Sequence, residues 1–303
     1  MLSRYSHQNL TWIDLECPTR EEAAAVGEEY GLHPLVVSEL SVRSERCKVD
    51  TYQNALYAVL RFPVRNRSTG HIEEAEIDFV LLGDTLITTH YELVDPLHDF
   101  ARMFEAGTHR GISSSGDHAG MLFFLQMREL YKHTFFILES TEAMIREIEK
   151  EVFKGKEDAM VERLSKASSA VLDIRAALRS HKEMLRSVSQ SGGRMYGPEF
   201  GSYMAVVEGE YAHIEQALEE SRQMVSDLRR TNDSLLSSKT NAIIKTLTVI
   251  SIVFAPLNLT AFIFAMHSPY IELETPEKLA AVFGAMGLMC LGSILYFRSK
   301  KWL

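Results

Sequence analysis

The sequence predicts an α+β domain followed by a long helical stalk and two C-terminal transmembrane helices. Three observations support this fold class. Strand-like and helix-like runs mix over residues 1–120, dense helical periodicity with few breakers covers 121–240, and two uncharged segments lie within 241–303. We take these three ranges as the domains of the chain.

The composition is that of a folded protein without a nucleic-acid partner. Hydrophobic residues make up 46% and charged residues 24% of the 303 positions, which excludes general disorder and fibrous repeats. The 41 Asp and Glu outnumber the 32 Lys and Arg, giving a net charge of -9, whereas nucleic-acid binders concentrate basic charge. The three cysteines are too widely spaced for a disulfide framework or a CxxC metal site, and they fit a reducing compartment.

The first domain is expected to combine short strands with two helices. The predicted strands are Trp12–Leu15, Ala55–Phe62, Ile77–Leu82 and Thr85–Thr89, with a hairpin-type turn at Gly83-Asp84 between the last two. The predicted helices are Arg20–Tyr30 and Pro34–Leu40. Thr19, followed by Glu22 three residues later, is a capping-box pattern that marks the start of the first helix.

The second domain is predicted to be helical. Leu122–Phe153 and Glu157–Gln190 have helical periodicity, and Gly192-Gly193 with Gly197-Pro198 indicate a loop after them. From about Tyr203 no breaking pair occurs before Pro256. One helix of roughly 60 residues, on the order of 90 Å long, therefore runs into the first apolar segment. A polar helix of this length needs neighbours, as in a coiled coil or an oligomeric stalk.

Two C-terminal segments have the length and composition of membrane spans. Leu247–Met266 and Leu279–Phe297 carry no charged residue, and about 20 helical residues cross a hydrocarbon core of about 30 Å. Two buried core helices of a soluble protein are the alternative, which fits these lengths and flanks poorly. We therefore expect a multi-pass protein of a bacterial-type inner (plasma) membrane, without a cleavable signal peptide.

The charges that flank the spans predict their orientation. The short loop 267–278 holds one lysine and three glutamates, whereas basic residues flank the two outer ends of the hairpin. These basic residues are Arg229, Arg230, Lys239, Lys245, Arg298, Lys300 and Lys301. Positive residues stay on the cytoplasmic side, so we expect both termini in the cytoplasm and the loop outside.

Polar and small side chains form one stripe on the first span. Its positions alternate by three and four residues: Asn241, Ile244, Thr248, Ser251, Ala255, Asn258, Phe262 and Ala265. Because polar groups facing lipid are costly, the stripe must face protein or water. Helix–helix packing through small and hydroxyl residues is one explanation. A water-filled axis in a symmetric oligomer is the other, and amide oxygens at both ends suit it because they can replace a cation's hydration shell. The stripe alone leaves both open.

Several segments agree in order with one known family. The run Thr240–Asn258 reads TNAIIKTLTVISIVFAPLN, and it is preceded by WIDL at 12–15, GLHPL at 31–35, Lys48-Val49 and LITT at 86–89. These segments resemble the CorA/ZntB superfamily of divalent-cation transporters over nearly the whole chain. The first of them is similar to that superfamily's first membrane helix.

The resemblance implies a funnel-shaped homopentamer in the lipid bilayer that passes a divalent cation, zinc or magnesium, along a central pore. It implies no tightly bound cofactor. The pore-lining positions that it implies are Asn241, Ile244, Leu247, Thr248, Ala255 and Asn258, which largely coincide with the stripe. This agreement favours the pore over packing, and we count Ser251, Ala265 and Met266 with the pore-lining residues. Leu247 would then be a hydrophobic constriction that gates by dewetting.

The sequence departs from the family at the outer end of this helix. Family members end it with Gly-Met-Asn, or Gly-Ile-Asn in zinc-type members, whereas this chain has Ala265-Met266-His267. Imidazole is a good zinc ligand, while magnesium prefers oxygen and releases water reluctantly. We therefore expect zinc to be favoured over magnesium. The expected cation ligands are Asn241, Thr248, Asn258 and His267; an interfacial His267 without metal contact is the alternative.

Other charged residues near the spans have two interpretations. Glu272, Glu274 and Glu277 would concentrate cations at the outer mouth, or they form an ordinary solvated loop. Lys245 lies beside the stripe and is expected to extend to the cytoplasmic headgroups. His109 and His118 are expected to be loop residues and not metal ligands.

The sequence contains no GxxxxGK[ST] loop, no HExxH and no nucleophile elbow, so we expect no enzyme activity. Two functions remain beside a zinc-favouring transporter. One is a magnesium (or cobalt or nickel) transporter of the same architecture. The other is a membrane scaffold or regulator that kept the fold and lost transport.

Overall fold

The computed structural model describes residues 1–106, 118–265 and 276–300. The chain divides into two compact units, Met1–Arg229 and Arg230–Leu303. The mixed α/β first part, the long helix and the two C-terminal apolar helices agree with the predicted fold class. The division by sequence into three domains stays a prediction.

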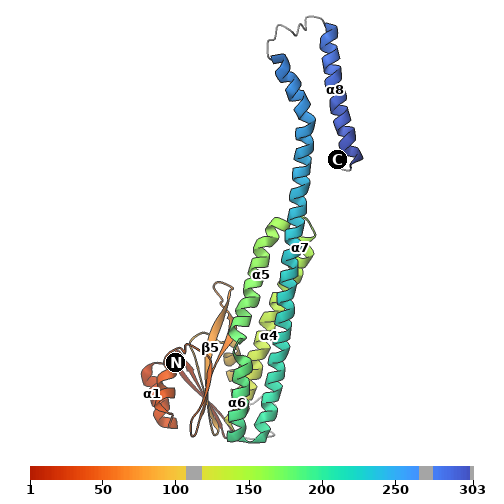
Figure 1. Ribbon diagram of the computed structural model, residues 1–303. Coiled ribbons are helices and arrows are strands. Elements are labelled where there is room, and N and C mark those ends of the chain that lie inside the picture. Colours follow the sequence, from red (N-terminus) through yellow and green to blue (C-terminus); the bar gives the residue numbers. More distant parts are fainter. Residues whose placement is uncertain (107–117, 266–275, 301–303) are drawn as a thin grey trace. The chain divides into compact units, whose positions relative to one another are not determined.

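A six-stranded sheet forms the centre of the first unit (Figure 1), in the order β1-β2-β6-β5-β4-β3. β2 and β6 are parallel, and the other neighbouring pairs are antiparallel. The strands are β1 (Leu2–His7), β2 (Leu10–Glu16), β3 (Lys48–Thr51), β4 (Leu56–Arg65), β5 (Ile72–Leu82) and β6 (Thr85–His90). The predicted turn at Gly83-Asp84 joins β5 to β6, so the hairpin is confirmed.

Two short helices, α1 (Arg20–Tyr30) and α2 (Pro34–Glu39), cover one face of the sheet. The capping box is present, because Thr19 accepts from the Glu22 N–H and Glu22 accepts from the Thr19 N–H. Alternating side chains of β2, β4, β5 and β6 pack against these helices, among them Ile13, Val80 and Ile87. This apolar layer is the first half of the core.

The opposite face of the sheet is covered by other helices (Figure 1). They are α3 (Asp95–Glu105), α4 (Ala119–Val152), α5 (Glu157–Leu178) and α6 (His181–Tyr196). Aromatic rings carry much of this contact. Trp12 packs edge-on against Phe100 of α3 with 5.3 Å between ring centroids, and Phe79 packs against Phe123 of α4 at 5.1 Å.

Several elements differ from the sequence prediction. β1, β3 and α3 were not predicted as a strand or a helix, because β1 and β3 are short, half-exposed edge strands and α3 begins with Pro96 in its first turn. The predicted single helix 157–190 is wrong, since α5 ends at Leu178 and α6 begins at His181. The predicted loop at Gly192-Gly193 is also wrong, because both glycines lie inside α6. The chain turns at Gly197, whose φ of 87° favours glycine.

His181 is completely buried at the start of α6 and joins the sheet to the helices. Its Nδ1 lies 2.6 Å from the Tyr131 hydroxyl of α4, and its Nε2 lies 2.7 Å from the Arg61 carbonyl oxygen of β4. Because the carbonyl only accepts, Nε2 carries the hydrogen and Nδ1 accepts from Tyr131. The neutral ring satisfies both contacts, and burial lowers its pKa to about 4.

We expect acid to destabilise the first unit through His181. The folded protein keeps this ring neutral down to a pKa of about 4, whereas the unfolded chain takes up a proton near pH 6.5. The contribution of the neutral ring is therefore complete above about pH 6.5 and is lost as the pH falls towards 4, a loss of about 3 kcal/mol. Urea unfolding followed by the fluorescence of the buried Trp12 measures it. The pH dependence should be smaller in His181→Gln than in the wild type, and equal pH dependence would contradict this explanation.

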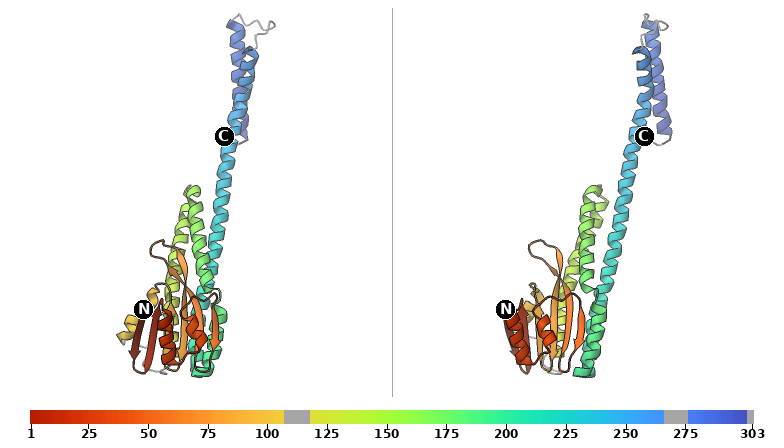
Figure 2. Two further views of the ribbon diagram at one scale, coloured as in Figure 1. Left: turned by 90° about the vertical axis from the view of Figure 1, so that its left-hand side faces the viewer. Right: turned by 60° about the vertical axis from the view of Figure 1, so that its left-hand side comes forward.

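Helix α7 (Pro198–Ala265) is continuous over 68 residues, and α8 (Pro276–Ser299) follows in the second unit. The long helix is confirmed and begins five residues before the predicted Tyr203. Pro256 lies inside it without ending it. Its first part runs beside α4 (Figure 2), where Arg128 donates to Glu210 at 2.8 Å and Phe124 packs on Tyr203 at 5.1 Å.

Candidate functional site

The polar stripe of α7 lies on one side of the helix and is not covered by the rest of the described chain. Asn241, Ser251, Ala255 and Asn258 are exposed, and Thr248 is half-exposed. With 3.6 residues per turn these positions stay within one side of the helix over five turns. The stripe is thus available to another molecule, to water or to lipid.

Helix α8 packs on the other side of α7. Val249 is 4% exposed, and the Cys290 thiol of α8 lies 3.8 Å from the Val253 carbonyl oxygen. Pro256 and Thr260 are half-buried along the same line. This line lies about 140° around the helix from the stripe. The contact within the chain therefore uses the back of α7 and leaves the stripe open.

The stripe hydroxyls present oxygen lone pairs outward. Thr248 donates to the Ile244 carbonyl oxygen at 2.8 Å, and Ser251 donates to the Leu247 carbonyl oxygen at 2.9 Å. Each hydroxyl hydrogen is thus used inside the helix, and the remaining lone pairs accept. These two oxygens can accept from water or contact a cation.

Two apolar residues interrupt the polar stripe near its N-terminal end. Ile244 is 54% exposed and Leu247 is 62% exposed. Leu247 lies about 70° from the centre of the stripe, so it stands at its edge. Apolar side chains of this size can close a narrow wet passage by excluding water.

Proline leaves one backbone acceptor on the membrane helix without its usual donor. Pro256 has no N–H for the carbonyl of Ile252, which lies four residues earlier. Thr260 donates to the Pro256 carbonyl oxygen at 2.6 Å one turn later. This contact does not replace the donor that the Ile252 carbonyl loses, and α7 continues through Pro256 with that carbonyl outside the regular helical hydrogen-bond pattern.

The C-terminal end of the site lies partly outside the described residues. Met266, His267, Glu272 and Glu274 are outside them, so their predicted roles stay predictions. Ala265 is the last residue of α7. Glu277 is exposed in the first turn of α8.

The first unit, Met1–Arg229, offers no competing metal centre within its described part. No group of three or more His, Cys, Asp or Glu side chains there is arranged to hold a metal ion. His118 precedes α4, and its ring stacks on Tyr196 with 4.6 Å between centroids. His109 lies outside the described residues.

The family described as "CorA-like Mg2+ transporter protein" matches residues 7–301. The chain belongs to this family. It is therefore a membrane transporter of divalent metal ions and not an enzyme. Its helices α7 and α8 are long and apolar enough to cross a membrane, and they are the two C-terminal spans of this CorA-like protein.

Relatives of this CorA-like chain cover almost its whole length. The cobalt/magnesium transport protein CorA of Thermotoga maritima is 26% identical over 298 residues, which make up 97% of this chain and 83% of that protein. The complete structure of the CorA magnesium transporter from Methanocaldococcus jannaschii has the same fold, with a TM-score of 0.85 at 16% identity over 99% of this chain and 93% of that chain. The cytoplasmic domain of ZntB from Vibrio parahaemolyticus gives a TM-score of 0.61 at 14% identity, over 77% of this chain and 90% of that one.

Proposed function

We propose that this protein is a homopentameric channel of the plasma membrane in which α7 of each subunit lines a central pore for divalent cations. The observation that carries this proposal is the open stripe of α7, because α8 occupies the opposite side and leaves amide and hydroxyl oxygens available. Two spans of one chain cannot enclose a channel. The stripe of one chain must therefore meet the stripes of other copies.

The cation ligands in this proposal are Asn241, Thr248, Asn258 and His267, with Ser251 and Ala255 between them. Leu247 and Ile244 form the gate. Asn241 and Asn258 place amide oxygens at the two ends of the stripe, where they can substitute for water around a cation. Glu277, with Glu272 and Glu274, attracts cations to the outer mouth.

Zinc is the favoured ion in this proposal because of His267. An imidazole ring suits zinc, whereas magnesium keeps its water and prefers oxygen. The named relatives also support the alternative of magnesium or cobalt, since one of them is named a cobalt/magnesium transport protein. The residue at 267 therefore decides between ions of one and the same pathway.

The membrane voltage is sufficient to drive uptake. A doubly charged cation gains about 4.6 kcal/mol on crossing 100 mV, inside negative. With both termini in the cytoplasm, as the basic flanks predict, the soluble unit meets the ion after it has crossed.

His267→Asn tests the ion preference. In proteoliposomes that contain a zinc-sensitive or a magnesium-sensitive dye, the ratio of zinc to magnesium flux should fall about tenfold in the variant, because a neutral amide replaces a zinc ligand. Glu277→Gln serves as the control, since it lowers the acidic charge at the mouth for both ions alike. An unchanged ratio would show that His267 has no metal contact.

The same experiment separates transport from a scaffold function. Folded, assembled wild-type protein that passes neither ion would favour a membrane scaffold. Flux of either ion that depends on the imposed voltage would exclude it.

A further inference from the structure

Asp78 of β5 is a completely buried carboxyl with too few hydrogen-bond donors. Its Oδ2 accepts from the Tyr57 hydroxyl at 2.8 Å, whereas its Oδ1 has no hydrogen-bond partner among the described residues. Thr89 is its cross-strand partner on β6, and the Thr89 hydroxyl is likewise buried without a partner in the described chain. Directly paired residues of antiparallel strands share one face of the sheet. Two unsatisfied oxygens therefore lie in the same layer, between the sheet and α1–α2.

The charged groups around Asp78 make a carboxylate unfavourable at this position. Glu76 lies two residues earlier on the same face of β5, and Glu39 faces the site from α2. Lys48 of β3 supplies the opposing charge, but it already pairs with Glu39 and, at 3.2 Å, with Asp50. Ionised Asp78 would thus add a buried negative charge beside two others.

Asp14 of β2 is a buried carboxyl of the same sheet that, unlike Asp78, has hydrogen-bond donors for both oxygens. Its Oδ1 accepts from the Thr88 hydroxyl at 2.5 Å, and its Oδ2 lies 3.3 Å from His90 Nε2. The hydrogen bond to Asp14 raises the pKa of His90 against the effect of burial, so the pair suits a carboxylate facing an imidazolium. Among the described residues, Asp78 accepts from the Tyr57 hydroxyl alone, and Lys48 already pairs with Glu39 and Asp50.

We propose that Asp78 holds a proton on Oδ1 in the folded protein at neutral pH. This neutral carboxyl stabilises the contact between the sheet and the connection from α2 to β3. The proton removes the buried charge and gives Oδ1 a hydrogen to donate across the strand pair, directly or through a water molecule, to the Thr89 oxygen. The site is therefore a proton-binding element of the soluble unit. Ionisation of Asp78 removes this hydrogen, restores the buried charge and so weakens the contact.

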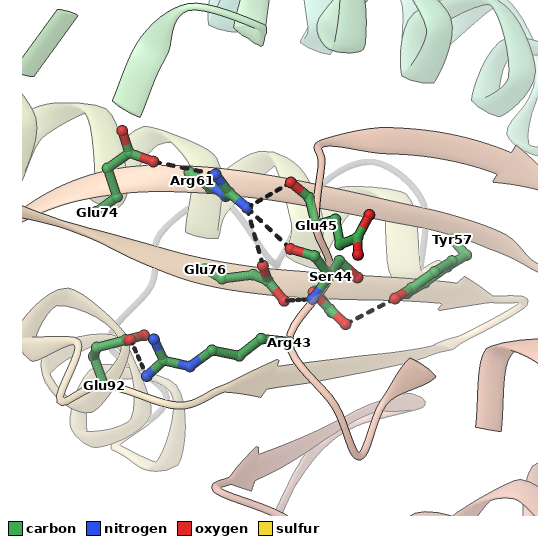
Figure 3. A network of polar contacts seen from close by, with 9 residues as sticks. Arg43, Ser44, Glu45, Tyr57, Arg61, Glu74, Glu76 and Glu92 are labelled. Carbon is green, nitrogen blue, oxygen red and sulfur yellow. Dashed lines mark hydrogen bonds and ion pairs between the residues drawn. The ribbon is translucent and has the colours of Figure 1, made fainter. Parts of the chain in front are cut away.

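The connection from α2 to β3 is held by residues that neighbour Asp78 on the sheet (Figure 3). Glu76 Oε1 accepts from the Ser44 backbone N–H at 2.7 Å, and Arg61 donates to the carbonyl oxygens of Ser44 and Glu45 at 2.9 and 3.1 Å. Arg61 and Glu76 are direct cross-strand partners, with 3.8 Å between their charged atoms. A negative charge on Asp78 repels Glu76 and so weakens the anchor on Ser44.

The titration behaviour agrees with this geometry. Burial raises the pKa of Asp78 well above its usual value, and Glu76 and Glu39 act in the same direction. Tyr91, at the end of β6, faces the same layer, and burial followed by Asp78 and Glu76 raises the pKa of its hydroxyl. The folded protein thus keeps a proton that the unfolded chain releases near pH 4. The stability this proton contributes is complete below about pH 4 and is lost as the pH rises through the folded pKa of Asp78.

Infrared spectroscopy of the full-length protein in detergent tests the proposal directly. At pH 7 the wild type should show a C=O stretching band of a protonated, buried carboxyl that is absent from Asp78→Asn. Asp14→Asn is the matched control and should keep the band. Thermal unfolding then gives the second readout: between pH 4 and 8 the Tm of the wild type should fall relative to that of Asp78→Asn, whose amide donates permanently. This difference cancels the contribution of His181, which both proteins share.

Tyr57→Phe keeps the test decisive if Asp78→Asn fails to fold. A neutral Asp78 keeps its infrared band in this variant, shifted in frequency by the loss of the hydroxyl donor. The proposal is overturned if the wild type lacks the band, if the band survives in Asp78→Asn, or if the Tm of both proteins depends on pH in the same way.

Discussion

Asn258→Leu should lower the divalent-cation flux through the protein on the order of 100-fold while the protein still folds and assembles. Asn258 is exposed on the open stripe of α7, where its amide oxygen is available to a passing cation. Leucine has the same number of side-chain heavy atoms, branched at the same carbon, and a good helix propensity, so the helix is kept. Loss of the amide leaves a dication with about 3 kcal/mol less stabilisation in the passage, which corresponds to the expected fall in rate.

The control for this variant is Thr246→Val. Thr246 is an exposed hydroxyl residue on the same helix, and it donates to the Ala242 carbonyl oxygen at 3.0 Å. It lies about 170° around α7 from the stripe. Flux into proteoliposomes should be near that of the wild type for Thr246→Val. If Asn258→Leu also retains normal flux, the amide serves only packing and the pore proposal fails at this position.

Gly192→Ala should destabilise the soluble unit by about 2 kcal/mol, although alanine is the better helix former. A Cβ at Gly192 would lie 2.2 Å from the Phe200 ring, which is far inside van der Waals contact. Phe200 is completely buried and cannot move away easily, because a Cβ added at Gly120 of α4 would meet the same ring at 2.8 Å. The phenyl ring thus fills a notch between α4 and α6.

Gly193→Ala is the control from the same turn of α6. No described atom lies within 4 Å of a Cβ added at Gly193, so this variant should be about 0.5–1 kcal/mol more stable than the wild type through helix propensity alone. Urea unfolding monitored by Trp12 fluorescence compares the two. Equal changes in the free energy of unfolding for the two variants would contradict the close packing of Phe200 against Gly192.

Local signals in the sequence predicted much of the first unit. The capping box at Thr19 placed the start of α1, and the Gly83-Asp84 turn placed the β5–β6 hairpin. The break between α5 and α6 had no such signal, because it is determined by the contacts of His181 with α4 and β4, which are distant in sequence. Gly192 was interpreted as a helix breaker for the same reason: only the packing of Phe200 explains a glycine inside a helix there.

The candidate site, like the first unit, was predictable from the sequence only in part. The alternation of Asn241, Thr248, Ser251 and Asn258 follows from helical periodicity, and the structure places these residues on one side of α7. The side that α8 covers depends on contacts such as that of Cys290 with Val253, which periodicity does not supply. The direction of the hydroxyl hydrogens also required the backbone geometry.

The direction of these hydroxyl hydrogens affects how protons could move along the proposed passage. A proton moves along a chain of water and side chains only where each member can turn and hand on a hydrogen. Thr248 and Ser251 donate their hydroxyl hydrogens to backbone carbonyl oxygens, so neither side chain is free to pass a proton on. Any movement of protons along a passage lined in this way would therefore depend on its water and not on these two side chains.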